Sequence, residues 1–282
     1  MDAIAHGNPA VESPKTLYHY CGMSGFEGIV KNKNVWLSNA FFTNDYTEHR
    51  LLIDKALERL KTKPDDKYRE FDKQLLKSLE NRKVPLYLAC FSSKRDLLSQ
   101  WREYSDNAAG FVIAFSYEAL NRRIESLRSK TPIFLARVSY EQQEQGMQLD
   151  NCLEKYRNKT VACPRNCESN VDDAHICIWF RAAQCKNHGF YEESEYRIIL
   201  MPNIPTVPED GISELRFRVT DRGKVPYYAF PFPENAVTEI GLGPKNCARF
   251  NRDAHEALRS FLRANGYDVD KIEIYEAEAT YQ

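Results

Sequence analysis

Residues 85–92 read Pro-Leu-Tyr-Leu-Ala-Cys-Phe-Ser, a nearly continuous apolar run with polar residues on both sides. A run of this length is typical of a strand that is buried on both faces. Stretches rich in β-branched and aromatic residues predict further strands. They lie at 17–20, 35–38, 111–115, 133–140, 196–201, 215–219, 237–242 and 272–275. The sequence therefore predicts a sheet with a central strand at 85–92.

Helical periodicity separates these strands. Ser24-Gly25-Phe26-Glu27 fits a capping box, with Ser24 as N-cap and Glu27 bonding back to it, so we expect a short helix from there to Lys33. Apolar stripes predict two helices on either side of Pro64 and a last helix that ends at Gly266. Further helices are expected at 97–104 and 176–185.

Strands and helices are interleaved without a regular βαβ period, so the predicted fold class is α+β. We expect one domain over residues 15–282, with a mixed or split β-sheet and flanking helices. Residues 1–14 are small, polar and punctuated by proline, which predicts a disordered N-terminal tail. Residues from about 141 to 175 are polar and contain cysteines, so a loop-rich insertion is expected there.

Four side chains of this insertion, Cys163, Cys167, His175 and Cys177, are possible zinc ligands. Their spacing differs from the C-x2-C pairs of ordinary zinc ribbons. We therefore expect reduced thiols and no bound metal.

The balance of 39 basic and 40 acidic residues, a formal charge of −1, excludes a protein that coats a polyanion by bulk charge. A local basic patch could still engage nucleic acid. The chain has no apolar run long enough for a bilayer and no secretory signal pattern, so we expect a cytoplasmic protein without a membrane partner. Glycine-rich nucleotide-binding motifs are absent from the sequence.

Paired carboxylates are the first candidate site. Glu193 and Glu195 are two residues apart at the entrance to a predicted strand, so their side chains share one face. Such a pair can stabilise a developing cation, bind a metal, or pair with Lys and Arg. Arg197 is two residues further on, and either pairs with Glu193 or contacts a ligand phosphate.

Aromatic and polar side chains supply further candidates. His19 lies on a predicted strand between tyrosines. Trp101 and Tyr104 are three residues apart on a short helix, where they form either a stacking platform for a flat ring or part of the core. Asn44 and Asp45 follow the second strand and either contact a ligand or cap the next helix.

The order of these motifs resembles a widespread bacterial domain family of unknown function, met in uncharacterised and phage-defence-associated proteins. The resemblance covers about residues 16 to 276. It is carried by Leu17-Tyr18-His19-Tyr20, Val35-Trp36-Leu37-Ser38 before Asn44-Asp45, Cys90-Phe91-Ser92, Trp101 with Tyr104, Glu193-Ser194-Glu195-Tyr196-Arg197, and Ile240-Gly241-Leu242-Gly243-Pro244.

More distantly, the strand histidine, the buried strand and the late E-x-E resemble the three motifs of ADP-ribosyltransferases. The resemblance implies that His19 orients a ribose of NAD, that Trp101 or Tyr104 stacks on nicotinamide, and that Glu195 is the catalytic carboxylate. The expected chemistry needs no metal, because a fixed carboxylate stabilises the oxocarbenium-like transition state. We expect the NAD site to include Tyr20, Asn44, Asp45, Ser92, Trp101, Arg102, Tyr104, Glu193 and Arg197.

The resulting hypothesis is an NAD-using ADP-ribosyltransferase or NAD-cleaving relative, acting as a phage-defence or toxin effector on a nucleic-acid or protein acceptor. A neutralising or sensor protein is a possible further partner. One alternative is a metal-dependent nuclease, with Glu193, Glu195 and an upstream Asp45 or Asp173 holding Mg²⁺. Another is a non-enzymatic binding module. For the transferase we expect His19 and Glu195 to converge on one cleft, with Glu195 at its mouth and little buried.

Overall fold

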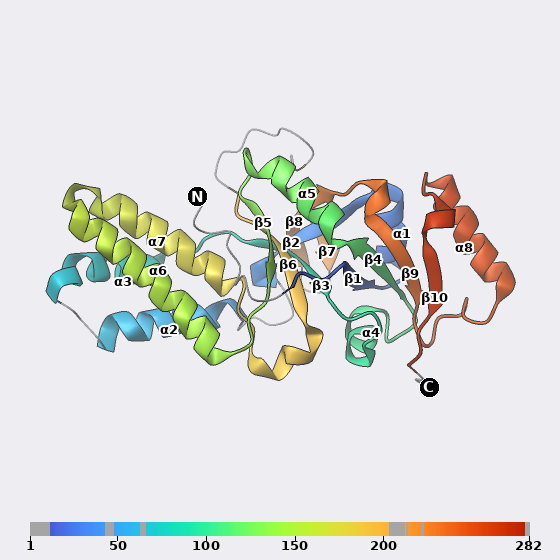
Figure 1. Cartoon of the computed structure of the whole chain (residues 1–282), viewed down its shortest axis with the longest axis horizontal. Helices are drawn as coiled ribbons and strands as arrows, with labels where there is room; N and C mark the ends of the chain where they lie inside the picture. Colours follow the sequence, from blue (N-terminus) through green and yellow to red (C-terminus); the bar gives the residue numbers. More distant parts are fainter. Residues whose placement is uncertain are drawn as a thin grey trace.

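The computed structural model describes residues 12–42, 48–62, 66–202, 212, 214–220 and 223–279. Within these residues one mixed sheet forms the centre of the molecule (Figure 1). Its strands are β1 (Thr16–Cys21), β2 (Asn34–Asn39), β3 (Tyr87–Ser92), β4 (Phe111–Ser116), β5 (Ile133–Arg137), β6 (Glu195–Leu200), β7 (Arg216–Thr220), β8 (Gly223–Pro231), β9 (Val237–Leu242) and β10 (Glu273–Glu276).

Helices flank this sheet, as the sequence predicts. They are α1 (Met23–Asn32), α2 (Glu48–Thr62), α3 (Arg69–Asn81), α4 (Leu98–Tyr104), α5 (Tyr117–Arg128), α6 (Gln142–Ala162), α7 (Cys167–Ala182) and α8 (Arg252–Ala264). Short 3₁₀ helices are η1 (Ala40–Phe42), η2 (Asp66–Tyr68), η3 (Pro164–Asn166), η4 (His188–Glu193), η5 (Glu234–Ala236) and η6 (Val269–Lys271). The expected mixed sheet with flanking helices is confirmed.

Strand β3 is the centre of the sheet, and the sheet splits along one of its edges. Strand β6 pairs with β3 from Tyr87 to Ser92. On the other edge β1 pairs with β3 at Ser92, whereas β2 pairs with it at Tyr87 and Leu88. Cys90 lies between these two pairings, where β1 and β2 diverge. The split of the sheet therefore occurs at Cys90.

The two faces of the sheet are covered differently. Alternation along β3 places Ala89 and Phe91 on one face, called here the core face, and Cys90 and Ser92 on the other, called the site face. On the core face α1, α5 and α8 pack over the main hydrophobic core, which includes Phe91. Figure 1 shows these helices above and to the right of the sheet.

The site face carries two separate covers. Helices α2, α3, α6 and α7 form a bundle that extends from one end of the sheet, and its core includes Leu88 and Ile199. Helix α4 covers β1 and β4 through Trp101. Figure 1 shows η4 below the sheet between the bundle and α4. Residues of β3 and β6 between these two covers form the floor of the candidate site.

One local prediction near the N-terminus is wrong, and two elements of the fold were not predicted. The expected capping box is wrong, because α1 begins at Met23 with Gly22 as N-cap and no side-chain cap bond, while Glu27 pairs with Lys31. Helix α5 and strand β8 were not predicted. The predicted tail falls largely on residues 1–11, which lie outside the described residues.

The segment 141–175 is not the loop-rich insertion that its composition suggests. It forms α6 and the first half of α7, with η3 between them. Leu149, Leu153 and Tyr156 recur at helical spacing and are buried in the bundle, while the many polar side chains cover the outer faces of α6. A helix with so few apolar residues is hard to recognise from composition. In the described residues no helix is long and apolar enough to cross a membrane.

Candidate functional site

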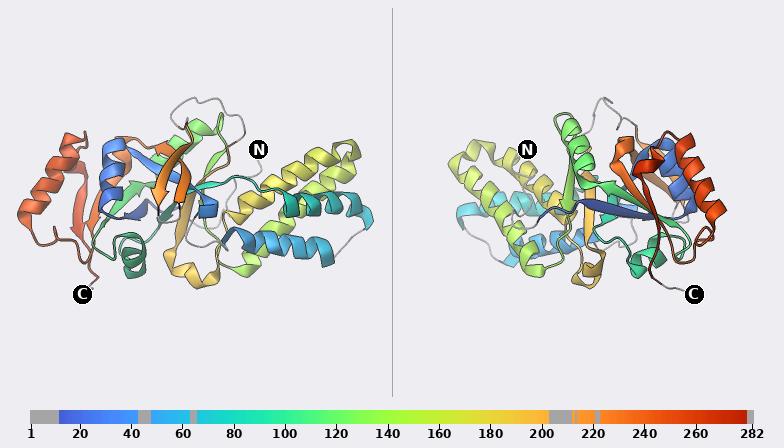
Figure 2. Two further views of the ribbon diagram at one scale, coloured as in Figure 1. Left: turned by 180° about the vertical axis from the view of Figure 1, so that it is seen from behind. Right: turned by 45° about the vertical axis from the view of Figure 1, so that its right-hand side comes forward.

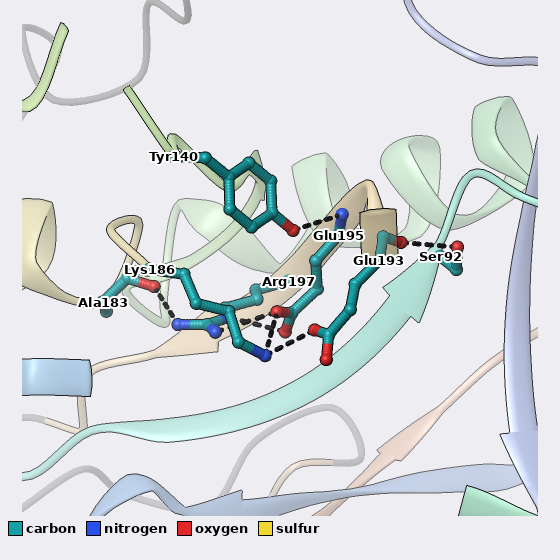
Figure 3. Close-up of polar contacts among 7 residues, drawn as sticks. All are labelled: Ser92, Tyr140, Ala183, Lys186, Glu193, Glu195 and Arg197. Carbon is teal, nitrogen blue, oxygen red and sulfur yellow. Dashed lines mark hydrogen bonds and ion pairs between the residues drawn. The ribbon is translucent and has the colours of Figure 1, made fainter. Parts of the chain in front are cut away.

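Glu195 and Arg197 form a buried ion pair at the start of β6 (Figure 3). The Nε of Arg197 donates to Oε1 of Glu195 at 2.7 Å, and its Nη2 donates to Oε2 at 2.9 Å. The two residues are two apart on a strand, so both side chains lie on the site face. This bidentate geometry is the strongest arrangement for an arginine and a carboxylate. Glu195 is 4% exposed and Arg197 is 1% exposed.

Lys186 joins this pair to Glu193. Its Nζ lies 2.5 Å from Oε2 of Glu193 and 3.2 Å from Oε2 of Glu195. Arg197 was expected either to pair with Glu193 or to contact a ligand phosphate; the structure shows an ion pair between Arg197 and Glu195, and one between Lys186 and Glu193 (Figure 3). Lys186, Glu193, Glu195 and Arg197 are called here the charge cluster.

Neighbouring elements hold the charge cluster in place. Arg197 donates from Nη1 to the carbonyl of Ala183 at the end of α7, at 2.9 Å. The backbone N–H of Glu195 donates to the hydroxyl of Tyr140 at 2.9 Å. Ser92 donates from its hydroxyl to the carbonyl of Glu193 at 2.6 Å. The cluster is thus anchored to the bundle, to the segment after β5, and to β3.

Ser92 was expected in the NAD site, but its surroundings give it another role. The side chain is buried, and its hydroxyl also accepts the backbone N–H of Lys94 at 3.0 Å. The Ser92 hydroxyl therefore already donates one hydrogen bond and accepts one within the protein. Ser92 fixes the turn that carries Glu193.

The charge cluster keeps Glu195 ionised. Burial alone would raise the pKa of this carboxyl group, but the charge and hydrogen bonds of Arg197 outweigh it, with help from Lys186 and Cys90. The resulting pKa is about 2. Glu195 therefore carries its charge throughout the physiological range, and its expected position at a cleft mouth with little burial is wrong.

Solvent reaches the site face at Cys90 and Tyr104. Cys90 is exposed although it lies in the middle of the sheet, and its thiol hydrogen-bonds to Glu195. Tyr104 is 37% exposed at the end of α4. Burial raises the pKa of the Tyr104 hydroxyl, and the charge of Glu193 raises it further. Tyr104 is therefore close enough to the charge cluster for the charge of Glu193 to act on its hydroxyl.

Trp101 does not line this site. The side chain is fully buried beneath α4, and its Nε1 donates to Oδ1 of Asp96 at 2.6 Å. Its ring packs edge-on against Tyr20, with centroids 4.9 Å apart. The hydroxyl of Tyr20 donates to the carbonyl of Lys94 at 2.9 Å. Both aromatic side chains are core residues, so the stacking role expected for Trp101 and the ligand role expected for Tyr20 are not supported by their positions.

His19 and Glu195 do not converge. Pairing aligns Glu195 with Ser92 and Ser92 with Tyr18, which places Tyr18 on the site face. Side chains alternate along the strand, so the side chain of the next residue, His19, is on the core face, where its ring centroid lies 5.4 Å from that of Phe91. Its Nδ1 bonds the carbonyl of Cys90 at 2.9 Å. The expected common cleft is wrong; His19 instead fills the split between β1 and β2.

The remaining predicted residues are placed as follows. Asn44 and Asp45 lie outside the described residues. Arg102 is exposed on α4.

His175 is buried in the bundle, where its Nδ1 bonds the hydroxyl of Ser78 at 3.0 Å and burial lowers its pKa to about 4. Over the part of the chain that the structure describes, no group of three or more His, Cys, Asp or Glu residues could hold a metal ion.

A recess of about 400 Å³ borders the turn that precedes β6. Its lining includes Ser93, Tyr140, Tyr191 and Ser194. Ser194 has a φ of 46°, a left-handed conformation that few side chains favour, and this turns the chain from η4 into β6. Charged side chains, among them Arg137, Glu141 and Glu144, complete the lining, so this recess is a polar surface separate from the cluster's own charges on the site face.

Lys186, Cys90 and Tyr140 were missed as site residues. Lys186 and Glu193 are seven residues apart, but the chain between them passes through η4 and not through an α-helix, so helical spacing does not relate them. Cys90 was read as part of a fully buried run, since periodicity does not reveal where a face is left uncovered. The signal that was available for Lys186 is its position directly after the predicted helix at 176–185, in the segment that leads to the E-x-E strand.

Comparison with known proteins finds one family. Residues 100–198, roughly a third of the chain, match the family described as Protein of unknown function (DUF2971). This confirms a domain of unknown function. The matched residues run from α4 to β6 and so include Tyr104 and the whole charge cluster. No curated protein and no solved structure gives a match.

Proposed function

We propose that the site face around Cys90, Tyr104 and the charge cluster is the active site of an enzyme that cleaves NAD and transfers its ADP-ribosyl group to a macromolecule. The observation that carries the proposal is the opening of the site face to solvent at Cys90 and Tyr104, next to a cluster whose Glu193 side chain stays partly exposed and whose charge acts on the Tyr104 hydroxyl. An aromatic ring and a carboxylate at an open site are the two groups that release of nicotinamide requires.

The two carboxylates take different roles in this proposal. Glu195 is enclosed and bound bidentately by Arg197, so its charge is already neutralised. The side chain of Glu193 is 14% exposed and forms an ion pair with Lys186. Glu193 therefore stabilises the ribosyl cation that develops as nicotinamide leaves. Glu195 and Arg197 hold Lys186, and through it Glu193, in position.

The proposal assigns no ligand contact to His19, Tyr20, Trp101 or Ser92, because each is used within the fold. Tyr104 takes the place of the stacking aromatic. Of the two arginines considered for the pyrophosphate, Arg197 is enclosed and Arg102 is exposed on the same helix as Tyr104. Arg102 is therefore the better candidate for that contact.

A metal-dependent nuclease fits the cluster less well. Mg²⁺ needs carboxylate oxygens that face it without competing cations. Here the ammonium of Lys186 and the guanidinium of Arg197 lie against the oxygens of both glutamates. A divalent ion at this position would be repelled by these two positive charges unless it displaced them.

Release of nicotinamide from NAD, measured in the presence of a chelator, tests the proposal. We expect turnover by the wild-type chain and a loss on the order of 10²- to 10³-fold in kcat for Glu193→Gln, with little change in KM. Tyr104→Ala should raise KM and lower kcat. The matched control is Asp72→Asn, which removes a carboxylate bound bidentately by Arg157 inside the bundle.

Turnover that survives in Glu193→Gln, or that falls equally in the Asp72→Asn control, would contradict the assignment of Glu193. Nucleic-acid cleavage that depends on divalent metal would favour the nuclease. Absence of both activities would favour a binding module.

A further inference from the structure

A second exposed surface lies on the outer strands of the sheet, on β2, β8 and β7. Trp36 on β2 is 41% exposed. Its ring lies 4.5 Å from that of Tyr227 on β8, with the planes 32° apart. The guanidinium of Arg218 on β7 lies 5.4 Å from the Trp36 ring. Figure 2 (left) shows β7 and β8, in orange, at the front of the sheet with no helix before them.

Register places these side chains on one face. Tyr227 is opposite Ser38 on one side and opposite Arg216 on the other, so Arg216 shares the face of Tyr227. Trp36 and Arg218 are each two residues from these partners and lie on the same face. Arg218 also donates to the hydroxyl of Ser38 at 3.0 Å, which fixes its position. Trp36, Arg216, Arg218 and Tyr227 are called here the Trp36 platform.

The platform continues the site face. Ser38 of β2 pairs with Leu88 of β3. Because β2 and β3 are antiparallel, Trp36 on β2 and Cys90 on β3 are each two residues from this pair in the same direction along the sheet. Both side chains are exposed. Strand β3 has β2 at one edge and β6 at the other, so the Trp36 platform and the charge cluster lie on opposite sides of β3 on the same face.

The charged side chains of the platform are all positive. Strands β2, β7 and β8 contain no acidic residue, although the whole chain has 40. Arg216 is exposed and Arg218 is half-buried. No carboxylate of the described residues pairs with either arginine. This is a local positive surface in a chain whose formal charge is −1.

We infer that the Trp36 platform binds a single-stranded nucleic acid. An exposed indole offers a stacking surface to an unpaired base, and two arginines on the same face offer contacts to the flanking phosphates. A duplex keeps its bases stacked on each other and presents no free base to Trp36. The position next to the charge cluster makes the strand the acceptor of the transferred group; that role rests on the proposed function, whereas binding itself does not.

Fluorescence anisotropy with labelled single-stranded RNA and DNA of mixed sequence, and with the annealed duplexes, tests the inference in the full chain without NAD. We expect single strands to bind and duplexes to bind far less. Trp36→Leu should weaken binding on the order of ten-fold or more through lost stacking. Arg216→Gln and Arg218→Gln should each lower the slope of log K against log salt by about 0.7.

Arg165→Gln is the control, because it removes the same charge from an exposed arginine in η3, between α6 and α7. Binding should be unchanged in this variant. Failure to bind single strands, equal binding of duplexes, or an equal loss in Arg165→Gln would overturn the inference. If Trp36→Leu does not fold, Arg216→Gln still tests the inference, because the Arg216 side chain is exposed and its replacement should leave the fold intact.

The two proposals fail separately. Strand binding without release of nicotinamide supports the platform and refutes the NAD-cleaving site. Release of nicotinamide without strand binding supports the site and refutes the platform.

Discussion

Replacing Glu195 by glutamine removes the carboxylate that contacts both Arg197 and Lys186. Glutamine has nearly the same size, so the change leaves no cavity. It leaves two buried cations, Arg197 at 1% and Lys186 at 5% exposure, that have both lost the negative charge of Glu195. Breaking a buried ion pair from one side costs about 3–5 kcal/mol, because the remaining charge has lost its compensation.

The pKa of Glu195 gives an independent magnitude. The folded value is about 2, against 4.5 for an ordinary glutamate, and this difference corresponds to about 3 kcal/mol. Because the folded pKa is the lower one, this stability is fully present above about pH 4.5 and is lost as the pH falls toward 2. Glutamine does not titrate. The gap in stability between wild type and variant should therefore close over that interval.

Urea unfolding followed by tryptophan fluorescence measures this gap. At about pH 7 we expect Glu195→Gln to lower the free energy of unfolding by about 3 kcal/mol, with an unchanged m-value. Glu193→Gln should cost less, because Glu193 is more exposed and Lys186 retains Glu195. A loss below about 0.5 kcal/mol, typical of surface substitutions, would refute the reasoning, as would a gap that stays constant as the pH falls.

Two further substitutions separate structure from activity. His19→Ala should lower the free energy of unfolding by about 1–3 kcal/mol, because the Cys90 carbonyl loses its side-chain donor, and should leave kcat for nicotinamide release unchanged; a large loss of kcat at full stability would restore a catalytic role. Trp101→Phe should lower the midpoint of thermal unfolding, since Asp96 loses the indole N–H, while an unchanged midpoint would contradict the core role.

Periodicity located the strands of the sheet because their apolar residues belong to one continuous core. The strand at 85–92 and its neighbours before β7 were predicted within a few residues. Strand β8 was missed because tyrosine, proline and lysine interrupt its apolar pattern. Helix α5 was missed because Leu120, Ile124 and Leu127 form a narrow stripe among charged residues. In each case the element is stabilised by packing against the sheet, which local sequence does not reveal.

The same limit applies to the site. The two-residue spacing was used to predict that Glu193 and Glu195 share a strand face, but Glu193 lies in η4 and not on β6. The pair that strand geometry does place on one face is Glu195 and Arg197. Their burial depends on the end of α7 and on the segment carrying Lys186, both of which reach the site by tertiary packing. No spacing rule relates Lys186 to Glu195.

Burial also reverses the roles that spacing suggested for the two glutamates. A carboxylate acts on a developing cation only if the cation can approach it. Glu195 is enclosed by Arg197 and Lys186, while the side chain of Glu193 is 14% exposed and its charge acts on the exposed Tyr104. The lowered pKa of Glu195 therefore marks a residue that holds the site together. In the proposed function, the residue that acts on the ribosyl cation is its more exposed neighbour, Glu193.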